Sequence, residues 1–537
     1  MAGTIQVRSQ TIDDKRLKSC FQIIAAFFPG AKTQSGDGSV QRMLCERDDQ
    51  DPKRARWIIA IEVTRKEENG IWSSETDETI TIQITNGYHH REYVSAHGPL
   101  VETDLMTEMT TKGLPGKEPL DQILMKRALC RALEDYTGKR LPWGILTGIR
   151  PGKLIERIYA LGYSDALKDN VLDDLYLIHR EKSELLQKIA KIQKPYKTTM
   201  MERHDLAAVY LSIPFCPTRC FYCSFPSNTI QTNRNDKQGL RLESDKLSRY
   251  LKALFEEISL FKETMHRRSL LADSIYIGGG TPTVLDALQL EQLLQRIRDR
   301  LPLEKDAEFT VEAGRPDTIT REKLSVMKEF GVNRISINPQ TMQNETLKQI
   351  GRRHTAQAVI DAYALARQMS DWHINMDLIL GLPNEGRQEI TESLEKILIL
   401  NPENITLHAL ALKRGSAAWE NQYAHDHMEE WQTIQTDLTE RLESCGYVPY
   451  YLYKQKNSVG NLENIGYAQK GKICRYNIAV IEELQNILGL GAGSSSKIFI
   501  QKGIHENIYH PIDLRCYEQQ RASIHDKIEK TLSKYRI

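Results

Sequence analysis

The run Tyr210-Leu-Ser-Ile-Pro-Phe-Cys-Pro-Thr-Arg-Cys-Phe-Tyr-Cys-Ser-Phe225 constrains this chain more than any other part of it. Its cysteines, Cys216, Cys220 and Cys223, have the spacing CxxxCxxC. Three thiolates on one short loop suit three irons of a [4Fe–4S] cube and leave the fourth iron without a protein ligand. The spacing therefore predicts an iron–sulfur cluster with one open iron, where chemistry can take place.

Two plainer interpretations fit the loop less well. Zinc sites usually reach four ligands with CxxC pairs or with histidine, and the histidines nearest in sequence are His204 and His266. A disulfide framework needs an oxidising compartment, whereas nine cysteines spread over 537 residues are typical of a reduced cytosolic chain. The other six have no partner at ligand spacing and are expected to be buried packing residues: Cys20, Cys45, Cys130, Cys445, Cys474 and Cys516.

Length and charge set the general class. A chain of 537 residues predicts about three domains. Its 72 basic and 71 acidic residues nearly cancel, so no overall field attracts nucleic acid or an anionic membrane. The first residues lack the apolar core of a signal peptide, and the apolar stretch Phe21–Phe28 is far too short to span a bilayer. We expect a soluble cytoplasmic protein with no membrane span and no nucleic-acid partner.

Residues 209–412 alternate between short β-branched runs and longer segments of helical period. The runs end in glycine, proline or polar residues: Val209–Phe215, Ser274–Gly280, Glu308–Gly314, Arg334–Gln340, Ile374–Leu382 and Asn404–Leu412. The helical segments between them include Ser244–Thr264, Leu288–Leu301, Arg321–Phe330 and Thr355–Met369. Strands buried on both faces and joined by helical crossovers form a parallel sheet that curls into a barrel. The pattern predicts an α/β fold with a partial (β/α)6 barrel.

The rest of the chain is predicted to form additional parts. Strand-like alternation in Arg56–Val63 and Glu78–Thr85, with a helix at Leu120–Leu133, indicates an α+β domain at 1–165. A helical linker at 166–205 contains an apolar stripe in Asp173–Gln193, which Pro195 is expected to end. The barrel is predicted at 206–415. A small C-terminal domain at 416–537 is expected to hold a helix near Trp419–Ser444 and a glycine-rich turn in Leu484–Lys497.

Unusual residues follow the predicted strands, where ligands bind in parallel α/β folds. The cysteine loop follows the first strand, Gly278-Gly-Gly-Thr-Pro-Thr283 the second, and Asn338-Pro-Gln340 the fourth. Glu312 and Asp377 stand in the otherwise apolar third and fifth strands, where a carboxylate without a partner is costly to bury. The sequence therefore predicts one shared site at the carboxyl ends of the strands.

These motifs resemble a known family. The cysteine run together with Gly278–Thr283 resembles the radical S-adenosylmethionine (SAM) enzymes, specifically the branch of oxygen-independent coproporphyrinogen III oxidase (dehydrogenase). The similarity covers residues 209–412, and the turn GLGAGSSS in Leu484–Lys497 is similar to a turn of the same branch. The stretches Leu141–Lys153 and Asn461–Tyr467 resemble its HemZ-like subgroup.

The resemblance implies two cofactors, a [4Fe–4S] cluster on the three cysteines and SAM. In this family the methionine end of SAM chelates the open iron, and the reduced cluster cleaves SAM to a 5′-deoxyadenosyl radical. Glycines would let the backbone approach the SAM amine, Glu312 and Arg352 would meet the charges of the methionine end, and Asp377 or Gln340 would bind the ribose. The implied SAM contacts are Tyr210, Tyr222, Gly279, Gly280, Thr281, Glu312, Gln340, Arg352, Asp377 and Ala411.

The resemblance further implies oxidative decarboxylation of two propionates of coproporphyrinogen III to vinyl groups. Its partners would be the porphyrinogen and a small electron-transfer protein such as a flavodoxin or ferredoxin. Lys413, Arg414 and Arg219 are candidate cations for the substrate carboxylates, although each also suits a solvated surface. The best-studied members have a fourth cysteine where this chain has Phe225. A haem chaperone and a haem-handling radical SAM methyltransferase therefore stay open as alternatives.

Overall fold

The computed structural model describes residues 4–8, 14–27, 31–34, 40–45, 57–65, 67–68, 71–72, 78–86, 89–96, 112–114, 118–148, 150–225, 228–230, 237–421, 423, 428–501 and 504–534. The chain divides into two compact units, Met1–Ala190 and Lys191–Ile537. The border falls inside helix α6, Arg180–Glu202.

The first unit is an α+β unit, as predicted for the N-terminal part. Its mixed six-stranded sheet has the order β2-β3-β1-β4-β7-β8. The strands are β1 Thr4–Arg8, β2 Ala31–Gln34, β3 Val40–Cys45, β4 Trp57–Arg65, β7 Glu78–Asn86 and β8 His89–Ala96, with a hairpin of β5 Glu67–Glu68 and β6 Ile71–Trp72. The helices are α1 Asp14–Phe27, α3 Leu120–Thr137, α4 Gly152–Ala160, α5 Asp165–Asn170 and a π-helical turn at Val171–Leu175. Helix α3 contacts β7, β8 and α1, and Ile82 and Leu129 are buried.

The second unit contains the predicted partial barrel. Its eleven-stranded sheet has the order β17-β18-β16-β15-β14-β13-β12-β9-β19-β20-β21. The strands are β9 Leu206–Ile213, β12 Leu271–Gly279, β13 Leu303–Glu312, β14 Arg334–Ser336, β15 His373–Leu380, β16 Asn404–Ala409, β17 Val448–Lys454, β18 Glu463–Ala468, β19 Asn486–Leu490, β20 Ser495–Gln501 and β21 Ile504–Tyr509. The six predicted strands are β9 and β12 to β16, and each neighbouring pair among them is parallel. The order has two ends, so the barrel is open.

Strands from beyond residue 415 extend this sheet on both sides. On one side β18 and β17 continue from β16 in antiparallel pairing. On the other side β19 joins β9 in parallel, and β20 and β21 follow in antiparallel pairing. The predicted ranges 206–415 and 416–537 thus contribute strands to one continuous sheet within one compact unit.

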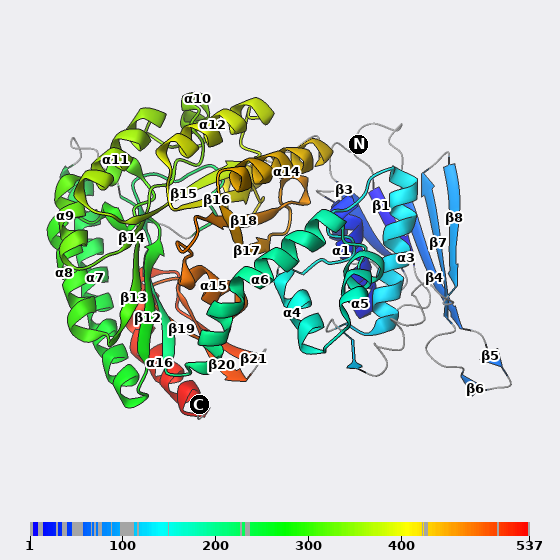
Figure 1. Cartoon of the computed structure of the whole chain (residues 1–537), viewed down its shortest axis with the longest axis horizontal. Coiled ribbons are helices and arrows are strands. Elements are labelled where there is room, and N and C mark those ends of the chain that lie inside the picture. The colour runs from blue at the N-terminus through cyan, green and yellow to red at the C-terminus, as the bar shows by residue number, and fades with distance from the viewer. Residues whose placement is uncertain are drawn as a thin grey trace. The chain divides into compact units, whose positions relative to one another are not determined.

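Helices cover the outer side of the parallel strands (Figure 1). They are α7 Lys237–Arg267, α8 Ala287–Arg300, α9 Arg321–Glu329, α10 Asn344–Gln349, α11 Ala356–Met369, α12 Arg387–Leu400, α14 Met428–Ser444 and α16 Leu514–Lys534. The short helix α13 Ala417–Glu420 contacts the cysteine loop, and α15 Arg475–Glu482 lies inside the curve of the sheet. Capping residues mark the first turns of three helices. The side chains of Asp286, Thr320 and Thr355 accept hydrogen bonds from backbone N–H groups in the first turns of α8, α9 and α11. The apolar stripes of these helices pack on the strands and leave the sheet interior for polar residues.

The prediction that Pro195 ends its helix is wrong, since α6 runs through it to Glu202. A proline removes one backbone donor and is costly inside a helix, so packing has to offset the loss. Ile192, Tyr196 and Met200 pack on one apolar cluster of the second unit, on both sides of the proline. Tertiary contacts therefore continue the helix where the sequence signal predicts its end.

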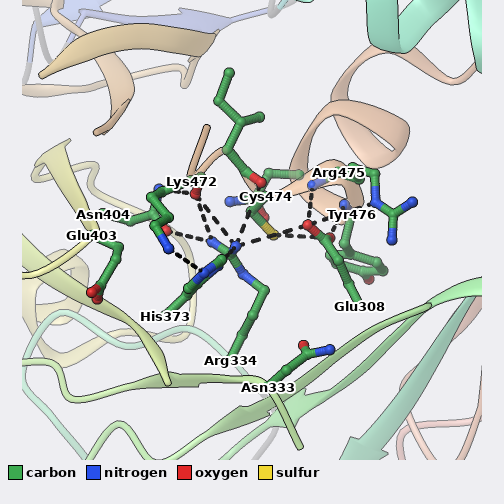
Figure 2. A network of polar contacts seen from close by, with 12 residues as sticks. Glu308, Asn333, Arg334, His373, Glu403, Asn404, Lys472, Cys474, Arg475 and Tyr476 are labelled. Carbon is green, nitrogen blue, oxygen red and sulfur yellow. Dashed lines mark hydrogen bonds and ion pairs between the residues drawn. The ribbon is translucent and has the colours of Figure 1, made fainter. Parts of the chain in front are cut away.

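The amino-terminal end of the barrel is closed by a polar network (Figure 2). The Glu308 carboxylate accepts the backbone N–H groups of Arg475 at 2.8 Å and Tyr476 at 3.0 Å, at the start of α15. Arg334, the first residue of β14, lies 3.8 Å from Glu308 and donates to the Lys472 carbonyl at 3.3 Å. The amino terminus of α15 and the Arg334 guanidinium both stabilise the negative charge of Glu308. These contacts hold α15 at the amino-terminal ends of the strands.

Candidate active site at the carboxyl ends of the barrel strands

The cysteine loop follows β9 and is fastened by backbone bonds to two other loops of the same edge. The Phe221 N–H donates to the Ile350 carbonyl at 3.0 Å, and the Phe221 carbonyl accepts from the Ala418 N–H at 3.0 Å. The Thr218 hydroxyl donates to the Gly351 carbonyl at 2.8 Å. The segments that follow β14 and β16 thus hold the cysteine loop that follows β9 in place.

The three thiols of this loop are half-buried and have polar neighbours. The Thr281 hydroxyl lies 3.6 Å from the Cys216 sulfur, and Arg315 Nη1 lies 3.9 Å from the Cys220 sulfur. Burial raises the pKa of Cys223, and Cys220 and Cys216 add to this effect. A hydroxyl and a guanidinium aimed at the sulfurs are the donors that thiolate ligands use.

The three thiols of one short loop suit three irons of a cubane. Among the described residues, no group of three or more His, Cys, Asp or Glu side chains could hold one metal ion together. In a [4Fe–4S] cube each cysteine binds a different iron, so the thiols need not meet at one point.

The glycine loop after β12 lies against the cysteine loop. The Gly280 N–H donates to the Ile213 carbonyl at 2.9 Å, and the Thr281 N–H to the Phe215 carbonyl at 2.7 Å. A Cβ on Gly280 would lie 2.4 Å from the Phe215 oxygen, and Gly279 has a φ of +104°. These glycines therefore allow the ends of two neighbouring strands to approach each other closely.

Glu312 lies inside the barrel at the end of β13. The Tyr276 hydroxyl donates to its Oε1 at 2.5 Å, and a Cβ on Gly278 would lie 2.8 Å from its Oε2. Burial raises the pKa of Glu312 to about 7, and the nearby Asp377 carboxylate adds to the shift. Glu312 can therefore exchange a proton near neutral pH.

Tyr210 lies in an aromatic stack at the same depth of the barrel. Its ring centroid is 6.3 Å from that of Tyr276, which lies 4.4 Å from that of Tyr476 on α15. Burial and the Glu312 carboxylate raise the pKa of Tyr210, so its hydroxyl stays neutral. The stack forms an aromatic layer beside Glu312.

Asp377 pairs with a residue that the sequence analysis missed. His408 Nε2 lies 3.6 Å from Asp377 Oδ2, and His408 Nδ1 lies 3.2 Å from the Asn464 side-chain oxygen. Burial alone would lower the pKa of His408, but the Asp377 carboxylate raises it above its ordinary value. The sequence signal for His408 was an isolated histidine in the sixth apolar run, three residues before the predicted Ala411 contact.

Gln340 and Arg352 fix the loops around this pair. Gln340 has a φ of +68°, and its N–H donates to the Asp377 carbonyl at 2.9 Å. Arg352 Nη1 donates to the carbonyls of Asn338 at 2.7 Å and Gly314 at 3.1 Å. Buried Arg352 Nε and the Asn338 side-chain oxygen have no hydrogen-bond partner within the described part of the chain. Arg352 Nε can therefore donate a hydrogen bond to a polar ligand, and the Asn338 side-chain oxygen can accept one.

Tyr222 and Arg352 meet beside Cys220. Burial raises the pKa of Tyr222, although Arg352 opposes the shift. Burial would lower the pKa of Arg352, but Tyr222 and Cys220 keep it above its ordinary value. The structure thus gathers Tyr222, Arg352 and Thr281 at the thiols, and Tyr210, Glu312, Gln340 and Asp377 in the barrel interior.

Two other predicted features have local structural explanations. Ala411 forms an isolated bridge with Ser458 and is buried. In the glycine-rich turn, the Gly491 N–H donates to the buried Glu257 carboxylate at 2.8 Å and the Gly493 N–H to the Pro511 carbonyl at 2.9 Å. The turn therefore uses these donors within the protein.

The remaining cysteines follow the packing expectation only in part. Cys20, Cys130 and Cys474 are buried as expected. Cys445 is exposed, since it stands in the turn after α14, so the packing interpretation is wrong for it. Cys516 is half-buried, and the side chain of Cys45 lies outside the described residues.

The chain is similar to several known proteins. The family model of the Radical SAM superfamily matches residues 210–397. The chain is 38% identical over 439 residues to the oxygen-independent coproporphyrinogen-III oxidase-like protein HemZ of Bacillus subtilis, covering 80% of this chain and 85% of the relative. It is 32% identical over 288 residues to the heme chaperone HemW of Lactococcus lactis, covering 54% of this chain and 69% of the relative. The coproporphyrinogen III oxidase HemN structure from Escherichia coli aligns with a TM-score of 0.47 and 20% identity, over 62% of this chain and 73% of that chain.

The barrel, the cysteine loop and the superfamily match define the class as a radical SAM protein, with a [4Fe–4S] cluster and SAM as its cofactors. Within that class the chain belongs to the family of the oxygen-independent coproporphyrinogen-III oxidase-like protein HemZ. Among the described residues, no helix has both the length and the apolar character needed to cross a membrane.

Proposed function

We propose that the chain is an oxygen-independent coproporphyrinogen III dehydrogenase of haem biosynthesis. It would convert two propionates of coproporphyrinogen III to vinyl groups and give protoporphyrinogen IX. Each conversion releases one CO2 and removes one hydrogen atom and one further electron from the side chain. The reaction needs an electron donor and an electron acceptor but no oxygen.

The observation that carries this proposal is the extent of the HemZ match. It covers 80% of the chain, whereas the Lactococcus HemW match covers 54%. The longer match includes sequence outside the 210–397 superfamily region. The part of the chain beyond the barrel therefore favours the oxidase-like relative over the chaperone.

The cluster and SAM, when bound, supply the hydrogen-abstracting chemistry. The residues of this chain bind and orient them. We assign the cluster to Cys216, Cys220 and Cys223, and the SAM contacts to the ten residues predicted above. Glu312 would accept the SAM amine, and Asp377 with Gln340 would accept the ribose hydroxyls. The tyrosine stack beside Glu312 would exclude water from this end of the site.

The proposals for the substrate and the partner depend on positive charge around the carboxyl ends of the barrel strands. Coproporphyrinogen III has four carboxylates, and Lys413, Arg414 and Arg219 stand on the surrounding loops. Arg219 Nη2 already donates to the Gly415 carbonyl at 2.5 Å, which holds the loop after β16 against the cysteine loop. A small electron-transfer protein such as a flavodoxin or ferredoxin would reduce the cluster, in the cytoplasm.

The decisive experiment uses the full chain, reconstituted anaerobically with iron and sulfide. Incubation with SAM, dithionite and coproporphyrinogen III should give a product smaller by two CO2 units and four hydrogens, with 5′-deoxyadenosine, by mass spectrometry. Deoxyadenosine without a decarboxylated porphyrinogen would contradict the proposed substrate while leaving the radical SAM class intact.

A haem chaperone is the second candidate function. HemW chaperones of several bacteria match the chain, and Phe225 replaces the cysteine that the best-studied oxidases carry. Incubation of the purified protein with haem distinguishes the two. A stable Soret band after gel filtration, together with no turnover of coproporphyrinogen III, would favour the chaperone.

A further inference from the structure

Arg315 is a buried cation beside a cluster ligand, and the reaction described above does not use it. It follows β13 by three residues and is 3% exposed. Its Nη1 donates to the Thr218 hydroxyl at 2.9 Å and lies 3.9 Å from the Cys220 sulfur. A buried guanidinium therefore faces the cysteine loop directly.

Asp317 lies on the other side of this guanidinium. Its Oδ1 is 3.2 Å from Arg315 Nε, and its Oδ2 is 3.4 Å from Nη2. Burial opposes ionisation, but His354 and Arg315 hold the pKa of Asp317 well below its ordinary value. Burial lowers the pKa of His354, whose Nδ1 lies 3.8 Å from Asp317 Oδ1. The group therefore holds one positive and one negative charge, with the positive one nearer the sulfur.

Charge and hydrogen bonds near the cysteine sulfurs set the reduction potential of an iron–sulfur cluster. Reduction adds one electron, so a nearby cation stabilises the reduced cluster and a nearby anion destabilises it. Burial strengthens the effect of Arg315, because little water screens its charge. Asp317 is an exposed residue, so water screens its charge more and its effect should be the smaller of the two.

We propose that Arg315 and Asp317 set the reduction potential of the cluster with opposite signs, Arg315 raising it and Asp317 limiting the rise. The step concerned is transfer of one electron from a reductant such as dithionite to the oxidised cluster, with no bond made or broken. The proposal rests on the cluster alone, so it stands or falls independently of the porphyrinogen substrate.

The test is a potentiometric titration of the reconstituted full chain without SAM, with the reduced cluster followed by electron paramagnetic resonance. Arg315→Gln should shift the midpoint potential to a more negative value, and Asp317→Asn to a more positive one. Arg315→Lys keeps the charge and should lie nearer the parent than Arg315→Gln. The matched control is Arg353→Gln, an exposed arginine next to Arg352, whose midpoint should equal that of the parent.

Opposite shifts distinguish an electrostatic role from a structural one, because loss of loop order alone would move both variants in the same direction. Unchanged midpoints, or shifts of the same sign in Arg315→Gln and Asp317→Asn, would overturn the proposal. Where Arg315→Gln fails to keep a cluster, Asp317→Asn decides the matter: a more positive midpoint supports the proposal, and an unchanged or more negative one overturns it.

Discussion

Asp377 on β15 and His408 on β16 form a half-buried pair across two neighbouring parallel strands, with Nε2 of the imidazole 3.6 Å from Oδ2 of the carboxylate. Asn375 adds a hydrogen bond of 2.8 Å to Asp377 Oδ1. The pair lies beside Glu312, whose pKa the Asp377 charge helps to raise. Glu312 and His408 make the charge of this site dependent on pH near neutrality, whereas Asp377, whose pKa is lowered, stays ionised there.

Replacing His408 with Asn should destabilise the chain in a pH-dependent way. The pKa of His408 is raised above 6.5, so its contribution is complete below that value and is lost as pH rises through the folded pKa. The pKa of Asp377 is lowered: burial opposes the shift, and His408 causes it, so that contribution is lost only in acid. We expect a loss of about 1 kcal/mol of unfolding free energy near pH 6 that shrinks near pH 9.

Urea unfolding at both pH values measures this difference. The exposed His266→Asn variant is the control and should match the parent at both. An equal loss for His408→Asn at both pH values would contradict an ionised pair.

SAM affinity should depend on pH through Glu312. With a pKa of about 7, Glu312 becomes protonated just below neutrality and then no longer accepts the SAM amine. We expect affinity to fall roughly tenfold per pH unit below about pH 7. Tyr276→Phe removes a donor that favours the ionised carboxylate, so the fall should begin at higher pH. Anaerobic calorimetry with SAM measures the affinity of the parent and of Tyr276→Phe at each pH. Glu312→Gln should bind SAM weakly, with an affinity that does not change with pH in this range. If the affinity of Glu312→Gln still fell below pH 7, the pH dependence would belong to another group.

Gly280→Ala should impair cluster incorporation. The new methyl would lie 2.4 Å from the Phe215 carbonyl and push the cysteine loop away from β12, at a cost of about 1–3 kcal/mol. Gly148→Ala is the matched control, because nothing lies within 4 Å of its Cβ position. Iron content and visible absorbance after reconstitution report the effect. Equal iron loading in both variants would show that the loop tolerates the displacement.

Glu308→Ala should destabilise the second unit strongly. It removes the acceptor of the α15 amino terminus and leaves Arg334 without its carboxylate, a loss of about 3–5 kcal/mol for a buried pair. Glu304→Ala, on the same strand β13, removes only a partly exposed ion pair with Arg203 and should cost within about 0.5 kcal/mol. Thermal unfolding compares the two, and similar melting temperatures would contradict the role of Glu308 in closing the barrel.

The barrel strands were predictable because they are buried on both faces. Such strands read as continuous apolar runs, and β9 is buried along most of its length. The polar positions that interrupt these runs, Glu312 and Asp377, were predictable as site residues because burial of a lone carboxylate is costly. Both lie inside the barrel, where Tyr276 and His408 satisfy them.

The missed features depend on contacts between distant parts of the chain. Strand β19 lies beside β9 although about 280 residues separate them, and periodicity carries no information about that partner. His408 needs the register of β15 and β16 to be matched with Asp377. In the sequence, Arg315 is an ordinary cation in a loop, and only the folded chain places it beside Cys220.

Glu308 and Arg334 hold α15 at the amino-terminal end of the barrel, whereas the cysteine loop lies at the carboxyl ends of the strands, so the opening for ligands is expected there. Cofactor fragments and porphyrinogen would then have to pass through the same opening. The proposed conversion of two propionates, with one SAM cleaved for each, would require spent methionine and deoxyadenosine to leave between its two halves. Under the proposed function, passage through that opening would decide whether a monovinyl product is released to solution or kept until the second propionate has reacted.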